Sequence, residues 1–233
     1  LSDGEVARLR RYTPEEMMRR VVRAEERDWR PAFLDRALPG CGAEVAPVIG
    51  AGMPQDRHHA AGSTNPHGFS IEWLRLAPGQ RLSRFRLPEK MVLIAHGGGA
   101  RLALNDDRSA LVGLGAWDTY PVPGGVRREI ENAGAETVDL VVVLAGDHRK
   151  RPESAPEVLA AAREGGLALD PGGYVAEPRL MPTHSVAAGW PDAAQPASGP
   201  LRARGGGRER LAVDPVGLCG RRNGPSGLRQ HDR

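Results

Sequence analysis

The fold is decided by one stretch of the chain, which reads Pro123-Gly124-Gly125-Val126-Arg127-Arg128-Glu129-Ile130-Glu131-Asn132-Ala133-Gly134-Ala135-Glu136. A Pro-Gly-Gly turn opens it, and Arg127–Asn132 is predicted to form a short strand. A second turn leads into Thr137–Leu144, a run rich in valine and leucine that predicts another strand. The stretch therefore predicts two strands joined by a tight connection.

Seven further segments of this kind precede the stretch. They are short, rich in Val, Ile and Leu, and separated by Gly, Pro, Asn or Asp. They comprise Glu44–Ile49, Gly68–Leu76, Leu82–Phe85, Lys90–Ala95, Ala100–Leu104, Ala110–Leu114 and Asp118–Val122. Because no segment long enough for a crossover helix lies between them, parallel βαβ units are excluded. The sequence predicts a mainly β fold, a sandwich or a barrel.

A helix is predicted near the start of the chain. Thr13-Pro14-Glu15-Glu16 has the pattern of a capping box, with threonine as the N-cap and proline at the first helical position. The helix is expected to end before Trp29. An apolar stripe at helical spacing, typical of a helix that packs on the rest of the fold, is formed by Met17, Met18, Val21, Val22 and Ala24.

A second helix is predicted after the strands. Ser154-Ala155-Pro156-Glu157 repeats the capping-box pattern, and Gly165-Gly166 is expected to end the helix. Asp170-Pro171-Gly172-Gly173 then predicts a turn. The apolar stretch Tyr174–Met181 that follows is expected to be extended and to pack against the strands.

Composition excludes several classes of protein. The chain has 233 residues, of which 30 are glycine and 20 are proline, and this favours short elements joined by turns over a long helical bundle. No apolar run approaches the roughly 20 residues of a membrane span. Cys41 and Cys219 lie far apart and lack metal-ligand spacing. We expect a cytoplasmic protein with no membrane partner, no disulfide framework and no zinc finger.

The last part of the chain differs from the rest. Residues 190–233 hold eight arginines against four acids, so this segment carries +4 and the remainder carries −1. Richness in Arg, Gly and Pro predicts a disordered tail over 185–233. Since Trp190 is its one aromatic residue, nucleic-acid binding is not predicted. The predicted divisions are a helical extension (1–43), a strand-rich barrel (44–150), a helix with an extended segment (151–184), and the tail.

The stretch that opens at Pro123 resembles the second motif of the cupin superfamily, in which a proline, a glycine, a histidine and an asparagine recur at fixed spacing. Arg128 stands where the family has its histidine, and Asn132 stands where it has its asparagine. The resemblance implies a jelly-roll barrel of the double-stranded β-helix type. The two predicted helices would be an N-terminal helix and a C-terminal helical extension of that barrel.

The first motif of the family is matched less closely. Gly79 resembles its opening turn, and Glu89 resembles its glutamate. Counted back from Glu89, the two histidine positions fall on Ser83 and Phe85. Counted forward from Gly79, they fall on Phe85 and Leu87. Neither register supplies a histidine.

The resemblance implies a metal site that is altered in this chain. A cupin metal site needs three imidazoles and usually a carboxylate, whereas here Glu89 remains and Arg128 adds a positive charge. We therefore expect no metal cofactor at this position. The alternative is a metal-dependent oxygenase or isomerase, whose divalent transition metal would be bound by other side chains such as His67, His96 and Glu89.

The altered pocket predicts a site for a small organic acid. Arg128 offers a guanidinium fork for a carboxylate, Glu89 is the predicted general acid or base, and Tyr120 is predicted to assist. These three are the predicted catalytic residues. The predicted substrate-binding residues are Ser83, Phe85, Met91, Trp117, Arg127 and His67.

Two further interpretations stay open. Glu89 and Arg128 could form a buried ion pair that fills the barrel, and this is compatible with a ligand that displaces the pair. The protein would otherwise be a non-catalytic barrel with a ligand-sensing or structural role. The resemblance also implies a homodimer, with a small molecule as the other partner.

Overall fold

The computed structural model describes residues 11–65 and 67–177. All of these residues belong to one compact unit of the chain. The predicted tail over 185–233, and the part of the predicted extended stretch beyond Glu177, lie outside the described residues. None of the helices in the described ranges is long and apolar enough to cross a membrane.

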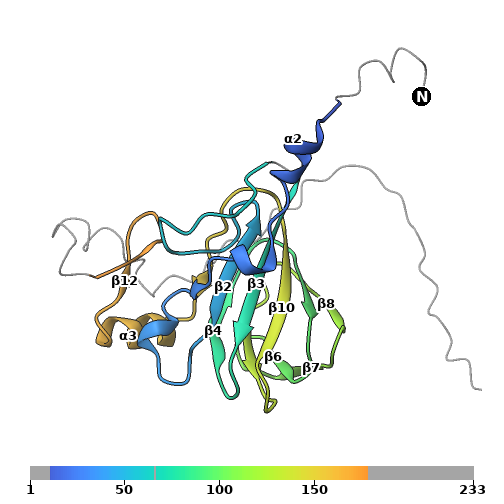
Figure 1. The fold of residues 1–233 in the computed structure, drawn as a ribbon. Coiled ribbons are helices and arrows are strands. Elements are labelled where there is room, and N and C mark those ends of the chain that lie inside the picture. Colours follow the sequence, from blue (N-terminus) through green and yellow to red (C-terminus); the bar gives the residue numbers. More distant parts are fainter. Residues whose placement is uncertain (1–10, 66, 178–233) are drawn as a thin grey trace, which may run out of the picture. The chain divides into compact units, whose positions relative to one another are not determined.

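Two antiparallel sheets make up most of this unit (Figure 1). The first sheet has the order β1 (Arg30–Pro31), β2 (Glu44–Ile49), β3 (Phe69–Leu76), β10 (Val138–Ala145), β5 (Met91–Ala95) and β8 (Thr119–Val122). The second has the order β11 (Glu153–Ser154), β4 (Arg81–Arg86), β9 (Arg128–Asn132), β6 (Ala100–Leu104) and β7 (Ala110–Leu114). A separate hairpin pairs β12 (Ala168–Leu169) with β13 (Val175–Ala176).

The strand order is that of a jelly roll. The eight strands from β3 to β10 are divided as β3-β10-β5-β8 and β4-β9-β6-β7, so the chain passes repeatedly from one sheet to the other. The predicted fold class is therefore confirmed. All nine strands predicted over 44–144 are present as β2 to β10, with ends that differ by at most one residue from the predicted ones.

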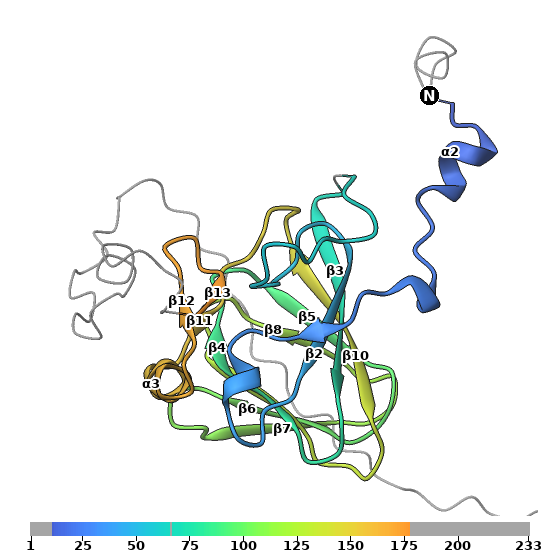
Figure 2. The same cartoon turned by 60° about the vertical axis from the view of Figure 1, so that its left-hand side comes forward.

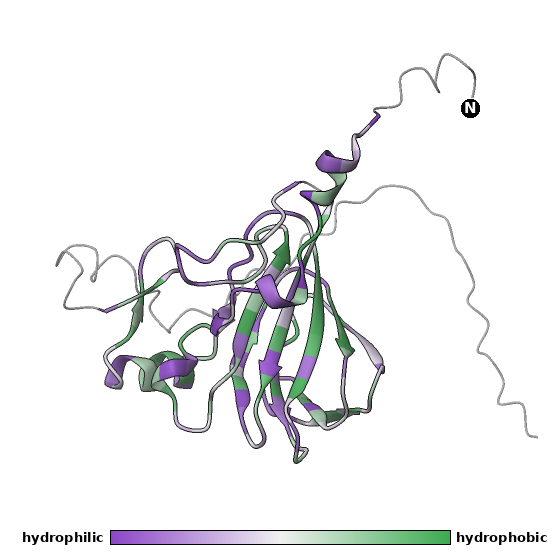
Figure 3. Ribbon diagram, in the orientation of Figure 1, coloured by the Kyte–Doolittle hydropathy of each residue, from purple (hydrophilic) through white to green (hydrophobic). Residues whose placement is uncertain are grey.

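Alternation along the strands builds the core. In β3, β5 and β10 every second residue is buried. The residues between them are also apolar in β5 and, apart from Asp139, in β10, whose ribbon is almost wholly in the hydrophobic colour (Figure 3). The inner faces of both sheets share one apolar cluster, whose completely buried members include Leu74, Leu76, Leu82, Phe85, Leu87, Leu93, Leu102, Ile130, Leu140, Val142 and Leu144. Large side chains thus fill the barrel, as they do in small barrels.

The N-terminal helix is much shorter than predicted. The capping box of Thr13 and Glu16 is formed, but α2 spans only Pro14–Met18, and a single 3-10 turn, η1 (Ala24–Glu26), follows. The expected packing stripe is wrong, because Met17 and Met18 are 48% and 55% exposed and α2 has no buried residue. A good N-cap starts a helix, but short helices without tertiary packing do not extend.

The second helix is confirmed with a different start. α3 spans Pro156–Glu164, and its N-cap is Ala155, which makes no side-chain cap bond, while Ser154 belongs to β11. Gly165 follows the helix as predicted. Figure 2 shows α3 beside the hairpin β12–β13. The helix packs with the 3-10 turn η2 (Asp35–Ala37) in a second apolar cluster whose buried members are Leu34, Ala155, Val158, Ala162 and Leu167.

Candidate functional site

A bulge in β4 decides which residues of the first motif face the barrel interior. Leu82 lies opposite Ile130 and Phe85 lies opposite Arg128, so the strand carries an extra residue between these pairs. Phe85 and Leu87 consequently both belong to the barrel core and are completely buried. The sequence left two registers open for the first motif. The register counted forward from Gly79 agrees with the structure, because its two positions, Phe85 and Leu87, both face the barrel interior.

Ser83 lies on the other side of the bulge, outside the barrel core. Its backbone N–H donates to both carboxylate oxygens of Asp35, at 3.2 Å each. Burial raises the pKa of Asp35 to about 7, although these bonds act in the opposite direction. Ser83 lines a separate cleft of about 180 Å³ together with Cys41 and Glu129. The expectation that Ser83 faces the barrel pocket is wrong, because the bulge reverses the alternation there.

Arg128 is the largest completely buried side chain of the barrel. Its Nε donates to the carbonyl oxygen of Val126 at 3.0 Å, and Nη2 reaches that of Pro123 at 3.4 Å. Nη1 lies 3.7 Å from Sδ of Met91, and the guanidinium carbon lies 5.5 Å from the ring centre of Phe85. The two terminal nitrogens therefore have only long contacts. Phe85 and Met91 do border Arg128, as predicted.

The guanidinium of Arg128 is charged and desolvated. No carboxylate among residues 11–65 and 67–177 lies within ion-pairing distance of Arg128. Burial lowers the pKa of Arg128 to about 10, because the guanidinium is desolvated. At neutral pH the barrel thus holds an uncompensated cation, which is costly unless an anion joins it.

Glu89 does not pair with Arg128, so the expected ion pair is not formed. Its Oε1 lies 3.2 Å from Nε2 of His148, whose side chain is 69% exposed. Its Oε2 is buried and has no hydrogen-bond partner in the described part of the chain. The turn at Gly124 packs closely against the backbone of Pro88 and Glu89. The approach is so close that a Cβ at Gly124 would clash with the carbonyl oxygen of Pro88. The two motifs therefore do lie side by side.

Glu72, which the sequence analysis did not select, also faces the interior. Its side chain is completely buried, and Oε2 accepts the backbone N–H of Met53 at 2.9 Å. Oε1 has no partner among the residues the structure describes. Burial raises the pKa of Glu72 to about 7, while the Met53 N–H and the more distant Lys150 act in the opposite direction. The sequence could have predicted this orientation, because Glu72 and Leu74 are two residues apart on a predicted strand and therefore point to the same face.

A second buried cation lies near Glu72. Lys150 is completely buried, and its Nζ donates to the carbonyl oxygens of Gly146 at 2.9 Å and of His148 at 2.6 Å. Burial lowers the pKa of Lys150, and attraction by Glu89, Asp147 and Glu72 offsets part of this effect. No sequence pattern pointed to Lys150, because it lies in a loop after the last barrel strand.

Strand register shows which interior residues lie side by side within each sheet. In the first sheet, one interior row consists of Ser70, Leu144, Met91 and Val122, and the next consists of Glu72, Val142, Leu93 and Tyr120. In the second sheet Arg128 pairs with Phe85 and with Leu104. Tyr120 is half-buried against the core and shares a row with Glu72, from which it is separated by two strands.

Three predicted substrate-binding residues lie elsewhere. Arg127 points away from Arg128, as neighbours on a strand do, and its Nε donates to Asp106 at 2.7 Å. Trp117 does not line the pocket, because it is 66% exposed on a turn with φ of +67° and packs against His96. His67 is exposed and stacks on Phe69, with ring centres 5.8 Å apart.

Comparison with known proteins gives structural matches only. No family model matches the chain, and no curated protein matches it. Similar solved structures include a cupin 2 barrel protein from Rhodopseudomonas palustris, with 11% sequence identity and a TM-score of 0.39. That match covers 53% of this chain and 74% of the other chain. A second is a variant of oxalate decarboxylase from Bacillus subtilis, with 17% sequence identity and a TM-score of 0.38. The match covers 53% of this chain and 28% of the other chain. A third is a cupin 2 domain protein from Halorhodospira halophila, with 19% sequence identity and a TM-score of 0.35. The match covers 42% of this chain and 66% of the other chain.

At these identities and TM-scores the matches carry no argument about a ligand or a reaction. The order of the eight strands decides the architecture. The chain has the cupin fold. Within this barrel, the residues that the motif resemblance assigns to ligand positions and that the structure buries in the interior are Phe85, Leu87 and Arg128.

These residues do not fit a metal ion. In the described ranges, no three His, Cys, Asp or Glu side chains are grouped so that they could hold one. The alternative ligand set does not converge: His96 lies between the rings of Trp73 and Trp117, His67 stacks on Phe69, and Glu89 contacts His148. Arg128 places a positive charge at the family's histidine position.

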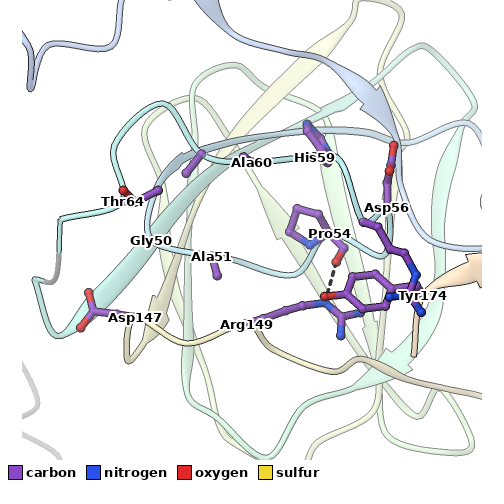
Figure 4. Close-up of a pocket in the computed structure, with 12 residues that line it drawn as sticks. Gly50, Ala51, Pro54, Asp56, His59, Ala60, Thr64, Asp147, Arg149 and Tyr174 are labelled. Atoms are coloured by element: carbon purple, nitrogen blue, oxygen red, sulfur yellow. Dashed lines mark hydrogen bonds between the residues drawn. The ribbon is translucent and has the colours of Figure 1, made fainter. Parts of the chain in front are cut away.

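An open cleft of about 320 Å³ is lined by the segment that follows β2, by Asp147 and Arg149 after β10, and by Tyr174 (Figure 4). Figure 4 shows Asp147 at one end and Tyr174 at the other. Arg149 donates to three carbonyl oxygens there, including that of Pro54 at 3.0 Å, and Arg57 pairs with Asp170. The cations of this cleft are thus engaged in bonds that hold loops together.

The floor of this cleft is also the cover of the barrel. Ala51 and Pro54 line the cleft, whereas Met53 between them is completely buried in the barrel core. Gly52 has φ of +57°, and a Cβ there would clash with Oε2 of Glu72. Only glycine allows the loop to approach the carboxylate so closely. One layer of chain therefore separates the cleft from Glu72.

Proposed function

We propose that this domain is a metal-free cupin barrel that binds a small monocarboxylic acid in its interior, with the carboxylate on Arg128. One observation carries the proposal: the completely buried guanidinium of Arg128 has no anion beside it in the described part of the chain. A buried cation without a partner costs several kcal/mol, and a bound carboxylate would recover this cost through two parallel hydrogen bonds.

The surroundings of Arg128 favour an acid with a short apolar tail. Nη1 and Nη2 make only long contacts, so their hydrogens remain available to a carboxylate. Phe85 and Met91, which contact Arg128, are completely or almost completely buried and form apolar walls at this position. A ligand has to displace a side chain from this packed interior, and Met91 or Met53 suits that role because methionine is unbranched and adaptable.

The proposal is tested by ligand-induced thermal shifts. Butyrate should raise the melting temperature of the wild-type protein in the millimolar range, whereas the neutral isostere butyramide should not. Arg128→Met should abolish the butyrate shift. The matched control is Arg101→Met on the neighbouring strand β6, whose side chain is half-exposed and pairs with Glu131. A butyrate shift that survives in Arg128→Met, or an equal shift with butyramide, would overturn the proposal.

A second candidate function, proton transfer to and from the bound acid, is favoured by Glu89. Its buried Oε2 has no partner among the described residues, and its Oε1 contacts the exposed His148. This arrangement connects a buried base to solvent, as acid–base catalysis requires. Glu89 would take a proton from the carbon beside a carbonyl, and a solvent proton would return to that carbon through His148 and Glu89.

This candidate is tested with 2-oxobutyrate in deuterated water. Deuterium should enter C3 faster with the wild-type protein than without it, as measured by proton NMR. Glu89→Gln should remove the acceleration while the butyrate-induced thermal shift persists. An exchange rate equal to that of the buffer would leave the barrel as a binding module only.

A further inference from the structure

A third cleft, of about 230 Å³, lies beside the segment that leads into η2. Its lining residues come from the segment 30–36, from the loop at 55–56 and from β13. Pro31 and Arg36 are exposed where they line the cleft, whereas Phe33 is only 3% exposed. The cleft therefore leads from the surface of the molecule to Phe33.

Phe33 belongs both to this cleft and to the barrel core. Among the described residues that line the cleft, it alone is a member of the apolar cluster that fills the barrel. Its ring meets the ring of Phe85 edge to face, with ring centres 5.3 Å apart. The ring centre of Phe85 lies 5.5 Å from the guanidinium carbon of Arg128. Two rings in sequence thus connect the cleft to the proposed carboxylate position.

The two clefts described above do not reach the core in this way. None of their described lining residues belongs to the core cluster. In the cleft of about 320 Å³ the barrier is backbone that is bonded to the segment after β10. The N–H of Ala51 donates to the carbonyl oxygen of Asp147 at 3.0 Å, and that of Lys150 donates to Gly52 at 2.7 Å. Opening there would break these hydrogen bonds, whereas a ring can turn without breaking any.

The backbone at Phe33 is strained. Its φ is +46°, a conformation that bulky residues rarely adopt. Leu34 follows with φ of −84° and ψ of 0°, and the N–H of Asp35 donates to the carbonyl oxygen of Ala32 at 3.1 Å. These features describe a turn of type II′, in which glycine is preferred at the position of Phe33. Strain of this kind is typical of ligand clamps and switch regions.

The charge at the mouth of this cleft suits an anion. Arg30 is paired with Asp28 and Asp56, at 2.6 Å and 2.7 Å. Arg36 lines the same cleft, is exposed, and makes no ion pair with a carboxylate of the described ranges. A cation that is not neutralised raises the local concentration of anions and the rate at which they associate.

We propose that this cleft is the entrance through which the monocarboxylate reaches Arg128, and that the side chain of Phe33 is its gate. This inference rests on the proposed function. The ring of Phe33 turns aside to let the ligand pass along Phe85, and it returns once the carboxylate is on Arg128. A gate of this kind slows entry and exit alike, because the ligand passes the same ring in both directions.

The gate is tested by fluorine NMR of 4,4,4-trifluorobutyrate exchanging with the full chain, which gives both rate constants and the Kd. A gate that is open for roughly 1–10% of the time slows both rates at least about tenfold. Phe33→Ala should therefore raise both rate constants at least about tenfold and change the Kd far less. The matched control is Leu102→Ala, which truncates a completely buried core side chain that lines none of these clefts and should leave both rates nearly unchanged.

A second variant tests the route from outside the barrel core. Val175 lines the cleft and packs on the apolar cluster beside α3, so Val175→Trp should obstruct the cleft and lower both rate constants about tenfold. Its matched control is Ala60→Trp, which places the same side chain in the cleft of about 320 Å³ and should leave both rates unchanged.

The outcomes separate this inference from the proposed function. Unchanged rate constants in Phe33→Ala would overturn the inference alone, because the ligand would still bind in the barrel. If Phe33→Ala does not fold, unchanged rates in Val175→Trp would do the same. Slower exchange in Ala60→Trp with no effect of Val175→Trp would move the entrance to the other cleft and overturn it as well. Absence of binding to the wild type would overturn the proposed function and this inference with it.

Discussion

The guanidinium of Arg128 lies against the sulfur of Met91, with Nη1 and Sδ 3.7 Å apart, and it has no carboxylate partner within the described ranges. This contact joins the two sheets of the barrel, since Arg128 lies on β9 and Met91 on β5. Sulfur is a weak acceptor. The positive end of the longest buried side chain therefore faces a soft, movable group in place of an anion.

Arg128→Met should stabilise the protein in the absence of ligand. The variant removes a desolvated charge and keeps much of the buried volume, and the lowered pKa of Arg128 corresponds to roughly 3 kcal/mol. The lowered value, about 10, lies above the working range, so Arg128 is charged in both folded and unfolded chains from pH 4 to pH 9. The gain should thus be constant over this range in urea unfolding. A loss of stability would show that Arg128 is a structural plug.

Glu72→Gln should change the pH dependence of stability. Because burial raises the pKa of Glu72 from 4.5 to about 7, the folded chain binds more protons than the unfolded chain between these values. Stability due to Glu72 is highest below pH 4.5, falls as pH rises through this window, and is constant above pH 7. The total change is roughly 3 kcal/mol. Glu72→Gln should match the wild type at pH 4 and exceed it at pH 8.

Urea unfolding at both pH values checks this expectation. Asp35, whose pKa burial also raises to about 7, contributes the same slope in both proteins, so the difference between them isolates Glu72. A constant difference between Glu72→Gln and the wild type from pH 4 to pH 8 would show that Glu72 does not titrate in this window.

Gly52→Ala should open the cover of the barrel. Gly52 has φ of +57°, and a new Cβ would clash with the carboxylate of Glu72. Gly68→Ala is the matched control, because Gly68 has φ of +77° but no atom lies near its Cβ position. We expect a loss of roughly 1 kcal/mol for Gly68→Ala and about 2–4 kcal/mol for Gly52→Ala. Equal losses in thermal unfolding would show that the Gly52–Glu72 contact is unimportant.

The homodimer implied by the resemblance should form through the outer face of the first sheet. This face carries a contiguous group of half-exposed apolar side chains, namely Ile71, Trp73, Val92, Ile94, Val141 and Val143. Val143→Lys, at the centre of this group, should yield monomers in size-exclusion chromatography with light scattering. Leu111→Lys, on β7 of the other sheet, should stay dimeric. A monomeric wild-type protein would refute this expectation.

Much of the fold followed from the sequence because local patterns coincide with the tertiary structure there. Turn residues bound each strand, and alternation sets the buried face, so β2 to β10 were predicted nearly to the residue. The predicted length of the N-terminal helix was wrong for the opposite reason. Its capping box is a local feature and is formed, but its length depended on packing that Met17 and Met18 do not find.

The candidate site was only partly predictable. Motif spacing identified Arg128 and its neighbours Phe85 and Met91, which strand pairing then brought together. The orientation of Ser83 depends on a bulge, and a prediction that assumes unbroken alternation along β4 places Ser83 on the wrong side. Lys150 reaches the interior from a loop, where no periodicity applies. Residues whose position depends on non-local loop packing are thus the ones that sequence reasoning missed.

The most direct test of the central claim is a crystal structure with 4-bromobutyrate, recorded at the bromine absorption edge. The account predicts an anomalous peak inside the barrel near Met91 and Phe85, with the carboxylate of the ligand on Nη1 and Nη2 of Arg128. Bromine peaks confined to the surface, such as the cleft lined by Arg57 and Arg149, with the Arg128–Met91 contact unchanged, would contradict it.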